Sequence, residues 1–569
     1  MEVSVLVPVY NGENFLQEAL ESLNNQIGAP RFEVIVVDDG SEDPNFVSEL
    51  AERILTLPYQ VIRQENSGVS VALNTGMAAS RAPAICWLSH DDVYQPDRLS
   101  KQYGFWQTLP ENSFLFGGYS TFGNRRGKVS FNKLRDSAGE VDGLSAIRMG
   151  LLNGCTAMWS KDYVSSLGGF SEDLRYTQDY DLWLRMYQSG VKFFFDPIPL
   201  TRTRLHSLQG SRLVSPQLEF ENIALMSRIA SAIARPAGNE KPRSAVLGNL
   251  SQLRQQILRE KYFAAFDMRT VLMTIDSEEH YLIEDLLVSV IIPTVPGREY
   301  WLSNALRSLE GQVHRRFEVV VVVNAEQTGN LEEAYHKLGE SYSFPIMFEW
   351  FDRPGSPGSC REKGVDISTG EYIAFLDDDD YFLPTKLHAQ LLLMAREELM
   401  LTATDYIYTD QWQFGREWGV VKLSWGENFF LQEGVKRGFR VGTPMLMVSR
   451  DLFIRARRRF GGSVFGGNSL GEDIRAVVAL TLENGGAIDS AGIPGLQVER
   501  NRFSSLRNSA AKQAVREVLA EFDGQLPVHR FFWGRFVFLR AKNIVLLAWQ
   551  SLRRRLLPKV RSLLSKVFE

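Results

Sequence analysis

Two acidic runs in the sequence have the residue types that bind a metal ion beside a phosphate. One is "LSHDDVYQPDRL" at 88–99 and the other is "LDDDDYFLPTKL" at 376–387. Asp before a turn often only caps the next helix, but four adjacent carboxylates repel one another unless a cation neutralises them. Their hard oxygens suit Mg²⁺ or Mn²⁺, which commonly also bind a substrate phosphate. The runs therefore predict sites where a metal stabilises the charge of a departing diphosphate.

The acidic runs belong to a longer internal repeat. Matching blocks follow in the same order, beginning with "VSVLVPVYN" at 3–11 and "VSVIIPTVP" at 288–296 and ending with "TQDYDLWLRM" at 177–186 and "GEDIRAVVAL" at 471–480. The offset between matching positions grows slowly, from 285 at the first proline to 294 in the last block. Each half is longer than 200 residues, so the pattern indicates a duplicated domain and not a solenoid.

Alternating strands and helices must position the acidic runs. Short apolar segments such as "FEVIVV" at 32–37 have the composition of buried parallel strands, and "NFLQEALESLNNQ" at 14–26 has helical spacing. "PAICWL" and "EYIAFL" are strands that deliver the acidic runs at their carboxyl ends, the edge at which open α/β sheets bind ligands. The prediction is a mostly parallel α/β sheet, formed twice. Neither a Walker loop nor a GxGxxG turn follows the first strand.

Composition sets the class of protein. The chain has 569 residues, of which 44% are hydrophobic and 23% charged, and its net charge of −5 argues against a nucleic-acid-binding protein. Three scattered cysteines favour a reducing compartment. The opening "MEVSVLVPVYNG" is unlike a signal peptide, and no apolar stretch is long enough for a transmembrane helix. We expect a cytoplasmic protein.

Both halves resemble family-2 inverting glycosyltransferases of the GT-A fold. The first half carries six motifs in order: "SVLVPVYNGENFL", "VIVVDDGSED", "NSGVSVALNTGM", "WLSHDDVYQPDRL", "LGGFSEDLRYTQDYDLWLRM" and "RLHSLQG". The second half carries "VSVIIPTVPGREYWLSNALRSL", "RPGSPGSCREKGVDISTGEYIAFLDDDDYFLPTKL" and "GEDIR". The resemblance implies sugar transfer from a nucleotide donor with inversion at the anomeric carbon, and a Mn²⁺ or Mg²⁺ cofactor.

The resemblance also implies roles for individual residues. The metal-binding Asp of the family's DXD motif is Asp91 in the first half and Asp379 in the second, and a late His, here His206, completes the metal shell. The Asp that opens the motif is Asp377 in the second half, whereas the first half has Ser89. The positions that hold the nucleotide sugar are Pro8, Tyr10, Asp39 and Asp92 in the first half, and Pro293, Asn324, Arg361 and Asp377 in the second.

The catalytic base implied by the resemblance is the Asp of a QD or ED pair. These residues are Asp179 after Gln178 and Asp473 after Glu472. One base that takes the acceptor's hydroxyl proton is sufficient for a one-step displacement. The alternative for Asp179 is a helix N-cap, and for His206 a surface position.

Two further segments complete the chain. Residues 216–285 have helical periodicity and are predicted to connect catalytic domains at 1–215 and 286–510. Residues 511–569 form a basic tail, with ten Lys and Arg residues from position 530 onward against one Glu. Interleaved aromatics favour a helix on an anionic membrane surface, and the alternative is a helix docked on the catalytic domains.

The sequence thus predicts a bifunctional, peripheral glycosyltransferase on the cytoplasmic face of a membrane. It would use nucleotide-sugar donors, by default UDP-sugars, with dTDP- and GDP-sugars open. The acceptor would be a growing surface glycan such as a lipid-linked O-antigen or capsule chain. The alternatives are one active domain beside a degenerate binding module, and a binding scaffold without turnover.

Overall fold

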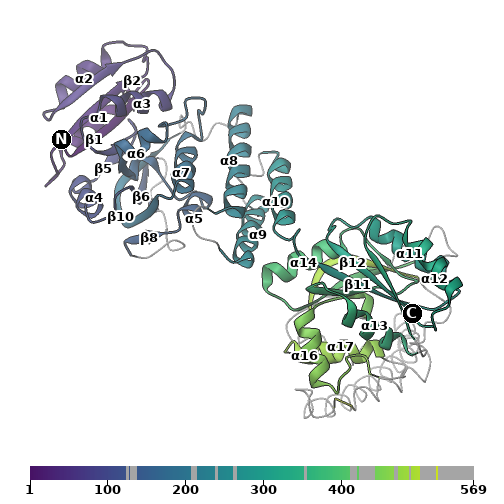
Figure 1. Ribbon diagram of the computed structural model, residues 1–569. Coiled ribbons are helices and arrows are strands. Elements are labelled where there is room, and N and C mark those ends of the chain that lie inside the picture. The colour runs from purple at the N-terminus through teal and green to yellow at the C-terminus, as the bar shows by residue number, and fades with distance from the viewer. Residues whose placement is uncertain are drawn as a thin grey trace, which may run out of the picture. The chain divides into compact units, whose positions relative to one another are not determined.

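The chain divides into two compact units, Met1–Leu282 and Ile283–Glu569, which are described separately (Figure 1). The structure is a computed structural model that describes residues 1–123, 127–128, 137–206, 215–236, 241–259, 266–351, 355–409, 420–421, 442–466, 472–485, 488–499 and 521–522.

The first unit is built on a sheet with the strand order β3-β2-β1-β4-β9-β6-β10-β5. The pairs β3–β2, β2–β1, β1–β4 and β6–β10 are parallel, and β9 pairs antiparallel with β4 and β6. The strands are β1 (Val3–Val9), β2 (Phe32–Asp38), β3 (Tyr59–Arg63), β4 (Ala84–Trp87), β5 (Val93–Tyr94), β6 (Ser113–Gly123), β7 (Gly127–Lys128), β8 (Gly139–Val141), β9 (Met158–Ser160) and β10 (Lys192–Leu205).

Helices cover both faces of this sheet because alternate strand residues point to opposite sides. In β1, Val5 and Val7 join one apolar core while Leu6 joins the other. The helices are α1 (Leu16–Asn24), α2 (Phe46–Ile54), α3 (Val69–Ala79), α4 (Arg98–Trp106), α5 (Gly143–Arg148), the 3₁₀ turn η1 (Gly154–Thr156), α6 (Lys161–Ser166), α7 (Gln178–Gln188), α8 (Pro216–Ala234), α9 (Arg243–Arg259) and α10 (Arg269–Tyr281).

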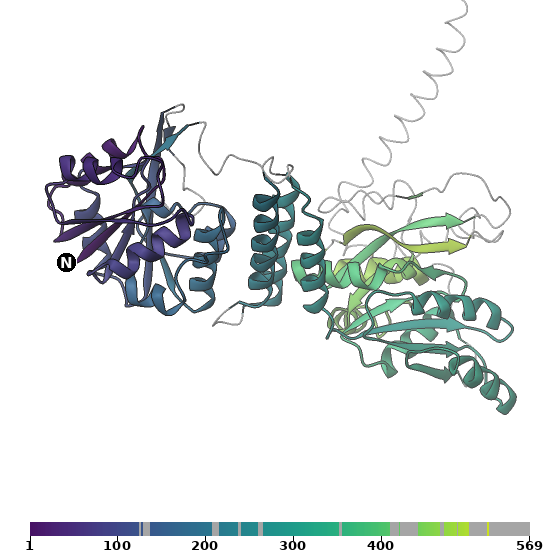
Figure 2. The same cartoon turned by 90° about the horizontal axis from the view of Figure 1, so that it is seen from above.

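Helices α8, α9 and α10 lie side by side (Figure 2) and share one core with the first sheet. Buried Leu225 and Ile229 of α8 belong to the same apolar cluster as Trp183 of α7 and Phe193 of β10. Most of the segment 216–285, which was predicted as a connector, therefore extends the core of the first unit. The predicted domain boundaries themselves stay a prediction.

The second unit repeats the strand order of the first, position for position: β13-β12-β11-β14-β18-β16-β19-β15. Its strands are β11 (Val288–Thr294), β12 (Phe317–Val323), β13 (Ile346–Trp350), β14 (Tyr372–Phe375), β15 (Tyr381–Phe382), β16 (Leu401–Thr409), β17 (Val420–Val421), β18 (Leu446–Ser449) and β19 (Asp489–Glu499). Its helices are α11 (Glu299–Glu310), α12 (Gly329–Gly339), α13 (Pro357–Ile367), α14 (Lys386–Glu397), the 3₁₀ turn η4 (Thr443–Met445), α16 (Arg450–Arg459) and α17 (Glu472–Glu483).

The predicted fold class, two mostly parallel α/β domains, is confirmed. The predicted tail helix lies outside the described residues, apart from Glu521 and Phe522. Within the described part of the chain, no helix combines the length and the hydropathy that a membrane span requires.

Candidate active sites

Two predicted metal ligands of the first unit meet at the carboxyl edge of its sheet. Asp91 lies in the loop between β4 and β5, and His206 directly follows β10. His206 Nε2 lies 3.0 Å from Asp91 Oδ2, and the His206 ring packs on Phe15 with ring centroids 4.8 Å apart. Residues 115 positions apart in sequence are thereby brought into one site.

This pair fits a divalent ion only in part. Asp91 offers a carboxylate oxygen and His206 an imidazole nitrogen, and Nδ1 of His206 is buried with no hydrogen-bond partner among the described residues. The described residues contain no group of three or more His, Cys, Asp or Glu side chains placed to hold a metal. An ion here would complete its shell with substrate phosphate and water, as Mg²⁺ does at many phosphate sites.

Asp92 differs from its neighbour because it is buried and contacts β10. Its carboxylate accepts hydrogen bonds from the Arg204 N–H (2.9 Å) and the Thr203 hydroxyl (3.4 Å). Burial, followed by the charge of Asp91, raises the Asp92 pKa to about 7. Asp92 thus fixes the end of β10, from which His206 reaches Asp91. Its predicted contact with the nucleotide sugar stays a prediction.

Of the residues predicted to hold the nucleobase, Tyr10 is exposed, whereas Pro8 and Asp39 are buried. Pro8 is buried within β1, while the ring of Tyr10 just beyond it is 47% exposed. Asp39 is buried and accepts hydrogen bonds from the N–H groups of Ser67 (2.9 Å) and Gly68 (2.8 Å). Asp39 therefore shapes the loop that enters α3, and Tyr10 is left as the exposed side chain at this edge.

Asn324 has the corresponding structural role in the second unit. Its side-chain amide exchanges two hydrogen bonds with the main chain of Gly355, at 2.8 and 2.7 Å. Pro293 is buried in β11, as Pro8 is in β1. Asp39 thus fixes the loop that enters α3, and Asn324 fixes the loop that enters α13.

Asp179 lies in the first turn of α7, where Thr177 and not Asp179 is the N-cap residue. Its carboxylate accepts a hydrogen bond from the Tyr180 N–H at 2.9 Å, and no Arg or Lys of the described residues pairs with it. Burial raises the pKa of Asp179 to about 6. A carboxylate that titrates near neutrality without a cationic partner has the properties of a general base.

A residue of α8 positions the start of α7. Glu221 is buried, and its carboxylate accepts hydrogen bonds from the N–H groups of Arg175 (3.0 Å), Tyr176 (2.8 Å) and Thr177 (3.0 Å), and from the Thr177 hydroxyl (3.2 Å). An anion suits this place because the N-terminus of a helix carries partial positive charge. The sequence analysis missed Glu221, although an acidic residue among the apolar positions of a helix was a usable signal.

A chain of hydrogen bonds connects the start of α7 to the Asp91 loop. The Tyr180 hydroxyl donates to the carbonyl of Leu152 (3.1 Å), and the Asn153 amide donates to the Thr203 hydroxyl (3.0 Å), which in turn contacts Asp92. These hydrogen bonds thus link the start of α7, which carries Asp179, to the loop that carries Asp91.

In the second unit, one guanidinium contacts both predicted carboxylate groups. Arg361 of α13 is 3% exposed; it pairs with Asp377 after β14 and lies 3.1 Å from Asp473 and 3.5 Å from Glu472 at the start of α17. Burial raises the pKa of Asp377 to about 6, although Arg361 acts in the opposite direction. Asp473 also accepts a hydrogen bond from the Thr443 hydroxyl. The strand-end cluster and the predicted base thus share one site.

A second arginine contacts the next two carboxylates of the acidic run. Arg298 donates from Nε and Nη2 to the two oxygens of Asp378, both at 2.7 Å, and lies 3.1 Å from Asp379. The Thr294 hydroxyl also donates to Asp378 at 2.7 Å. Arg298 thus contacts both Asp378 and Asp379, whereas Asp91 in the first unit contacts His206.

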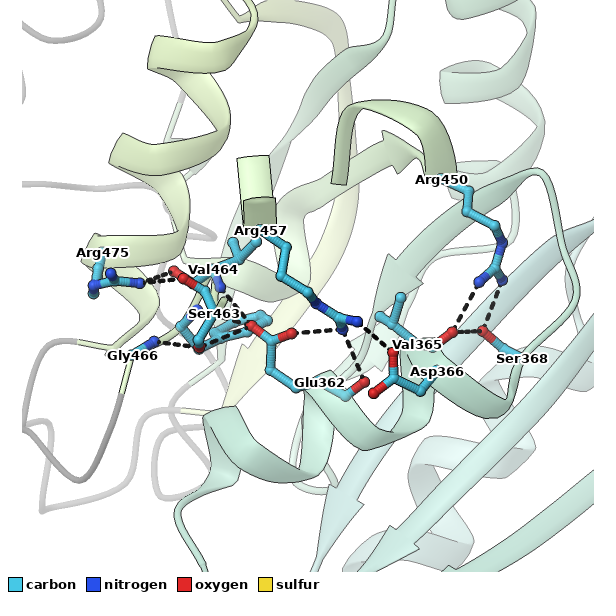
Figure 3. A network of polar contacts seen from close by, with 11 residues as sticks. Glu362, Val365, Asp366, Ser368, Arg450, Arg457, Ser463, Val464, Gly466 and Arg475 are labelled. Carbon is cyan, nitrogen blue, oxygen red and sulfur yellow. Dashed lines mark hydrogen bonds and ion pairs between the residues drawn. The ribbon is translucent and has the colours of Figure 1, made fainter. Parts of the chain in front are cut away.

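A polar network holds the helix that carries Arg361 (Figure 3). Glu362 pairs with Arg457 of α16 (2.6 Å) and accepts a hydrogen bond from the Val464 N–H (2.6 Å). Arg475 of α17 donates to the carbonyls of Ser463 (2.7 Å) and Val464 (2.9 Å) in the same loop. The network joins α13, α16 and α17, and thereby fixes Arg361 relative to Asp473.

Comparison with known proteins places both units in one family. The family described as "Glycosyl transferase family 2" matches residues 4–162 and 289–455. An uncharacterized glycosyltransferase of Rickettsia bellii (strain RML369-C) is 32% identical over 72% of this chain and 58% of its own length. An uncharacterized glycosyltransferase of Rickettsia conorii (strain ATCC VR-613 / Malish 7) is 29% identical over 71% of this chain and 65% of its own. The chain thus spans about three fifths of the length of these curated relatives.

A shorter match and a solved structure add to these similarities. The amylovoran biosynthesis glycosyltransferase AmsE of Erwinia amylovora is 29% identical over 33% of this chain and 70% of its own length. The crystal structure of S. aureus TarS 1-349 in complex with UDP-GlcNAc is similar with a TM-score of 0.40 and 20% identity, over 50% of this chain and 81% of that one.

Proposed function

The chain belongs to glycosyl transferase family 2, and we propose that it is an inverting enzyme with two active sites that transfers sugars from nucleotide donors to a growing glycan. The observation that carries this proposal is the Arg361 contact, which joins the strand-end Asp377 to Asp473 at the start of α17. A one-step displacement needs a base and a charge-stabilising group within reach of the same substrate.

In the first site, the proposed base is Asp179. Its carboxylate takes the proton from the acceptor hydroxyl as that oxygen attacks the anomeric carbon, and burial keeps its pKa near 6. Asp91 and His206 would hold a Mn²⁺ or Mg²⁺ ion, whose positive charge stabilises the leaving diphosphate. Tyr10 offers its exposed ring to the nucleobase.

In the second site, Asp473 is the proposed base. Its side chain is 43% exposed, so an acceptor hydroxyl can reach it. The cation nearest to it is Arg361, whose guanidinium suits a phosphate through paired hydrogen bonds. Arg361 is held by three carboxylates. Its N–H groups would also donate hydrogen bonds to the diphosphate of the sugar nucleotide.

The donor and acceptor are proposed by class. UDP-sugars are the default donors, with dTDP- and GDP-sugars as the other options. The relative from Erwinia amylovora is named for amylovoran biosynthesis, which supports a glycan product, and we propose a surface glycan built on a lipid-linked acceptor. The ten basic residues of 530–566 would attach the protein to the anionic inner face of the membrane.

A second candidate is one active domain beside a binding module. It is favoured by the contacts of Asp473, which pairs with Arg361 and Thr443 while Asp179 has no such cationic partner in the described residues. A screen of nucleotide sugars with the full chain, Mn²⁺ and glycan acceptors tests the proposal by measuring release of free nucleoside diphosphate. Donor binding without any acceptor-dependent release would indicate a scaffold instead.

A further inference from the structure

The acidic loops of the two units carry different residues at matched positions. Counted from the equivalent prolines Pro8 and Pro293, Glu13 in the first unit corresponds to Arg298 in the second. Counted from Asp91 and Asp379, His90 corresponds to Asp378.

These matched positions meet in the second unit, where Arg298 contacts Asp378 at 2.7 Å. In the first unit, a Cβ atom on Gly12, the residue before Glu13, would lie 3.6 Å from the His90 ring, and Glu13 itself is exposed. The first unit therefore has no arginine at the place where Arg298 meets Asp378 in the second.

A second pair of matched positions changes from neutral to charged. Arg361 and Asp377 pair in the second unit, where the first unit has Leu73 and Ser89. The alignment is supported by the glycines three residues beyond Arg361 and Leu73. A Cβ on Gly364 would contact Ile291 of β11, and one on Gly76 would contact Leu6, the equivalent residue of β1.

The two sites consequently differ in how their carboxylates are neutralised. In the second unit each of five carboxylates has an arginine partner: Asp377, Asp378, Asp379, Glu472 and Asp473. In the first unit, neither Asp91, Asp92 nor Asp179 pairs with an Arg or Lys of the described residues, and Arg204 donates to the main-chain carbonyl of Asp91 (3.0 Å) and pairs with Glu18. The additional Asp residues of "DDDD" thus hold arginines in place.

We propose that the second site binds the diphosphate of its donor through arginine, without a divalent cation, because Arg298 occupies the place beside Asp379 that a metal ion would need. A bidentate guanidinium–carboxylate pair resists displacement. The guanidinium also weakens the local attraction of Asp378 and Asp379 for a divalent ion. The first site, with the Asp91–His206 pair, keeps the ion. This inference deepens the proposed function, but its test measures metal binding and does not depend on sugar transfer.

The test counts Mn²⁺ ions bound per full-length chain, from the loss of the electron paramagnetic resonance signal of free Mn²⁺. Asp379→Asn should leave the count unchanged, whereas Asp91→Asn should lower it. Arg298→Gln should add about one ion per chain, since it removes the guanidinium from beside Asp378 and Asp379. Arg307→Gln, on the exposed side of the same helix α11, is the matched control and should change nothing.

A reciprocal exchange keeps the test valid if Arg298→Gln does not fold. The double variant Glu13→Arg with His90→Asp places the arginine–aspartate pair of the second site in the first, and should lower the Mn²⁺ count as Asp91→Asn does. Loss of an ion in Asp379→Asn would overturn the proposal. An unchanged count in a folded Arg298→Gln variant, or in the folded double variant, would also overturn it.

Discussion

The guanidinium of Arg361 lies 3.1 Å from the carboxylate of Asp473, although the two residues are 112 positions apart. Arg361 is almost fully buried, whereas Asp473 is 43% exposed. The contact therefore fixes the base candidate from its buried side and leaves its other side open to an acceptor. The equivalent contact cannot form in the first unit, where Leu73 stands in place of Arg361.

Conservative replacement of each base should separate the two reactions. Asp179→Asn should stop one sugar transfer and Asp473→Asn the other, each with a rate loss of about 10²–10⁴, which is typical for removal of a general base. Asn keeps the side-chain volume, so circular dichroism should show intact folding. The assay is product analysis by mass spectrometry with each donor in turn. If Asp473→Asn leaves every transfer unchanged, the second unit is a binding module.

The transfer that depends on Asp179 should fall as the pH drops through about 6. Burial raises the pKa of Asp179 to about 6, and the base acts only when ionised. Below that pH the rate should decrease about tenfold per pH unit. A pH–rate profile under single-turnover conditions measures this, and a flat profile between pH 5 and pH 8 would exclude Asp179 as the base.

The same raised pKa predicts a stability change in Asp179→Asn. A carboxyl whose folded pKa lies above its unfolded value destabilises the fold when ionised, so its cost appears as the pH rises from about 4 to 6. The Asn variant should therefore be more stable than the wild type at pH 7 to 8, by an amount on the order of 3 kcal/mol. Near pH 3.5 the two proteins should unfold at similar denaturant concentrations. Equal stabilities at pH 8 would contradict the burial of an ionised Asp179.

Removal of the Glu221 carboxylate should impair the first transfer, although Glu221 itself does not contact the substrate. Glu221→Ala leaves three N–H groups before α7 without an acceptor, which should cost about 1–3 kcal/mol of stability. We expect a lower kcat, little change in donor KM and a shifted pH–rate profile, since Glu221 holds the segment that leads into the turn of Asp179. Glu219→Ala on the same helix, where Glu219 contacts Asp267 instead, is the control. An unchanged pH profile in the folded variant would limit Glu221 to a structural role.

Removal of divalent metal should abolish the transfer that uses Asp91 and His206. A leaving diphosphate needs a counter-charge, and the described residues offer no Arg or Lys paired with Asp91. Dialysis against EDTA followed by activity assays with and without Mn²⁺ measures the requirement. Full rates of both transfers by the metal-free protein would refute the metal role at Asp91.

Truncation after Gly524 should remove binding to anionic membranes. The ten basic residues of 530–566 lie beyond this point, and each contributes about 1 kcal/mol near an anionic surface. Co-sedimentation with vesicles of anionic and of neutral lipid compares the full and shortened chains. Equal sedimentation of both chains would favour a tail docked on the catalytic domains.

The sequence by itself determined the duplication, the α/β class and the sheet edge at which the carboxylates gather. These follow from local patterns, because strand periodicity and residues at strand ends are encoded within short segments. The base candidates that the motifs selected, Asp179 and Asp473, both lie in the first turn of a helix. Apolar periodicity indicated that 216–285 is helical, but it could not show against which part of the protein these helices pack.

Only the tertiary structure decided what each carboxylate contacts. Asp91 and Asp379 occupy equivalent positions in corresponding motifs, yet one lies against His206 and the other against Arg298. Glu221 reaches the start of α7 from a helix that the sequence analysis assigned to a connector. The charge and pKa of a buried group depend on neighbours within a few ångströms. Those neighbours come from distant parts of the chain, so the fold and not the motif sets the chemistry of each site.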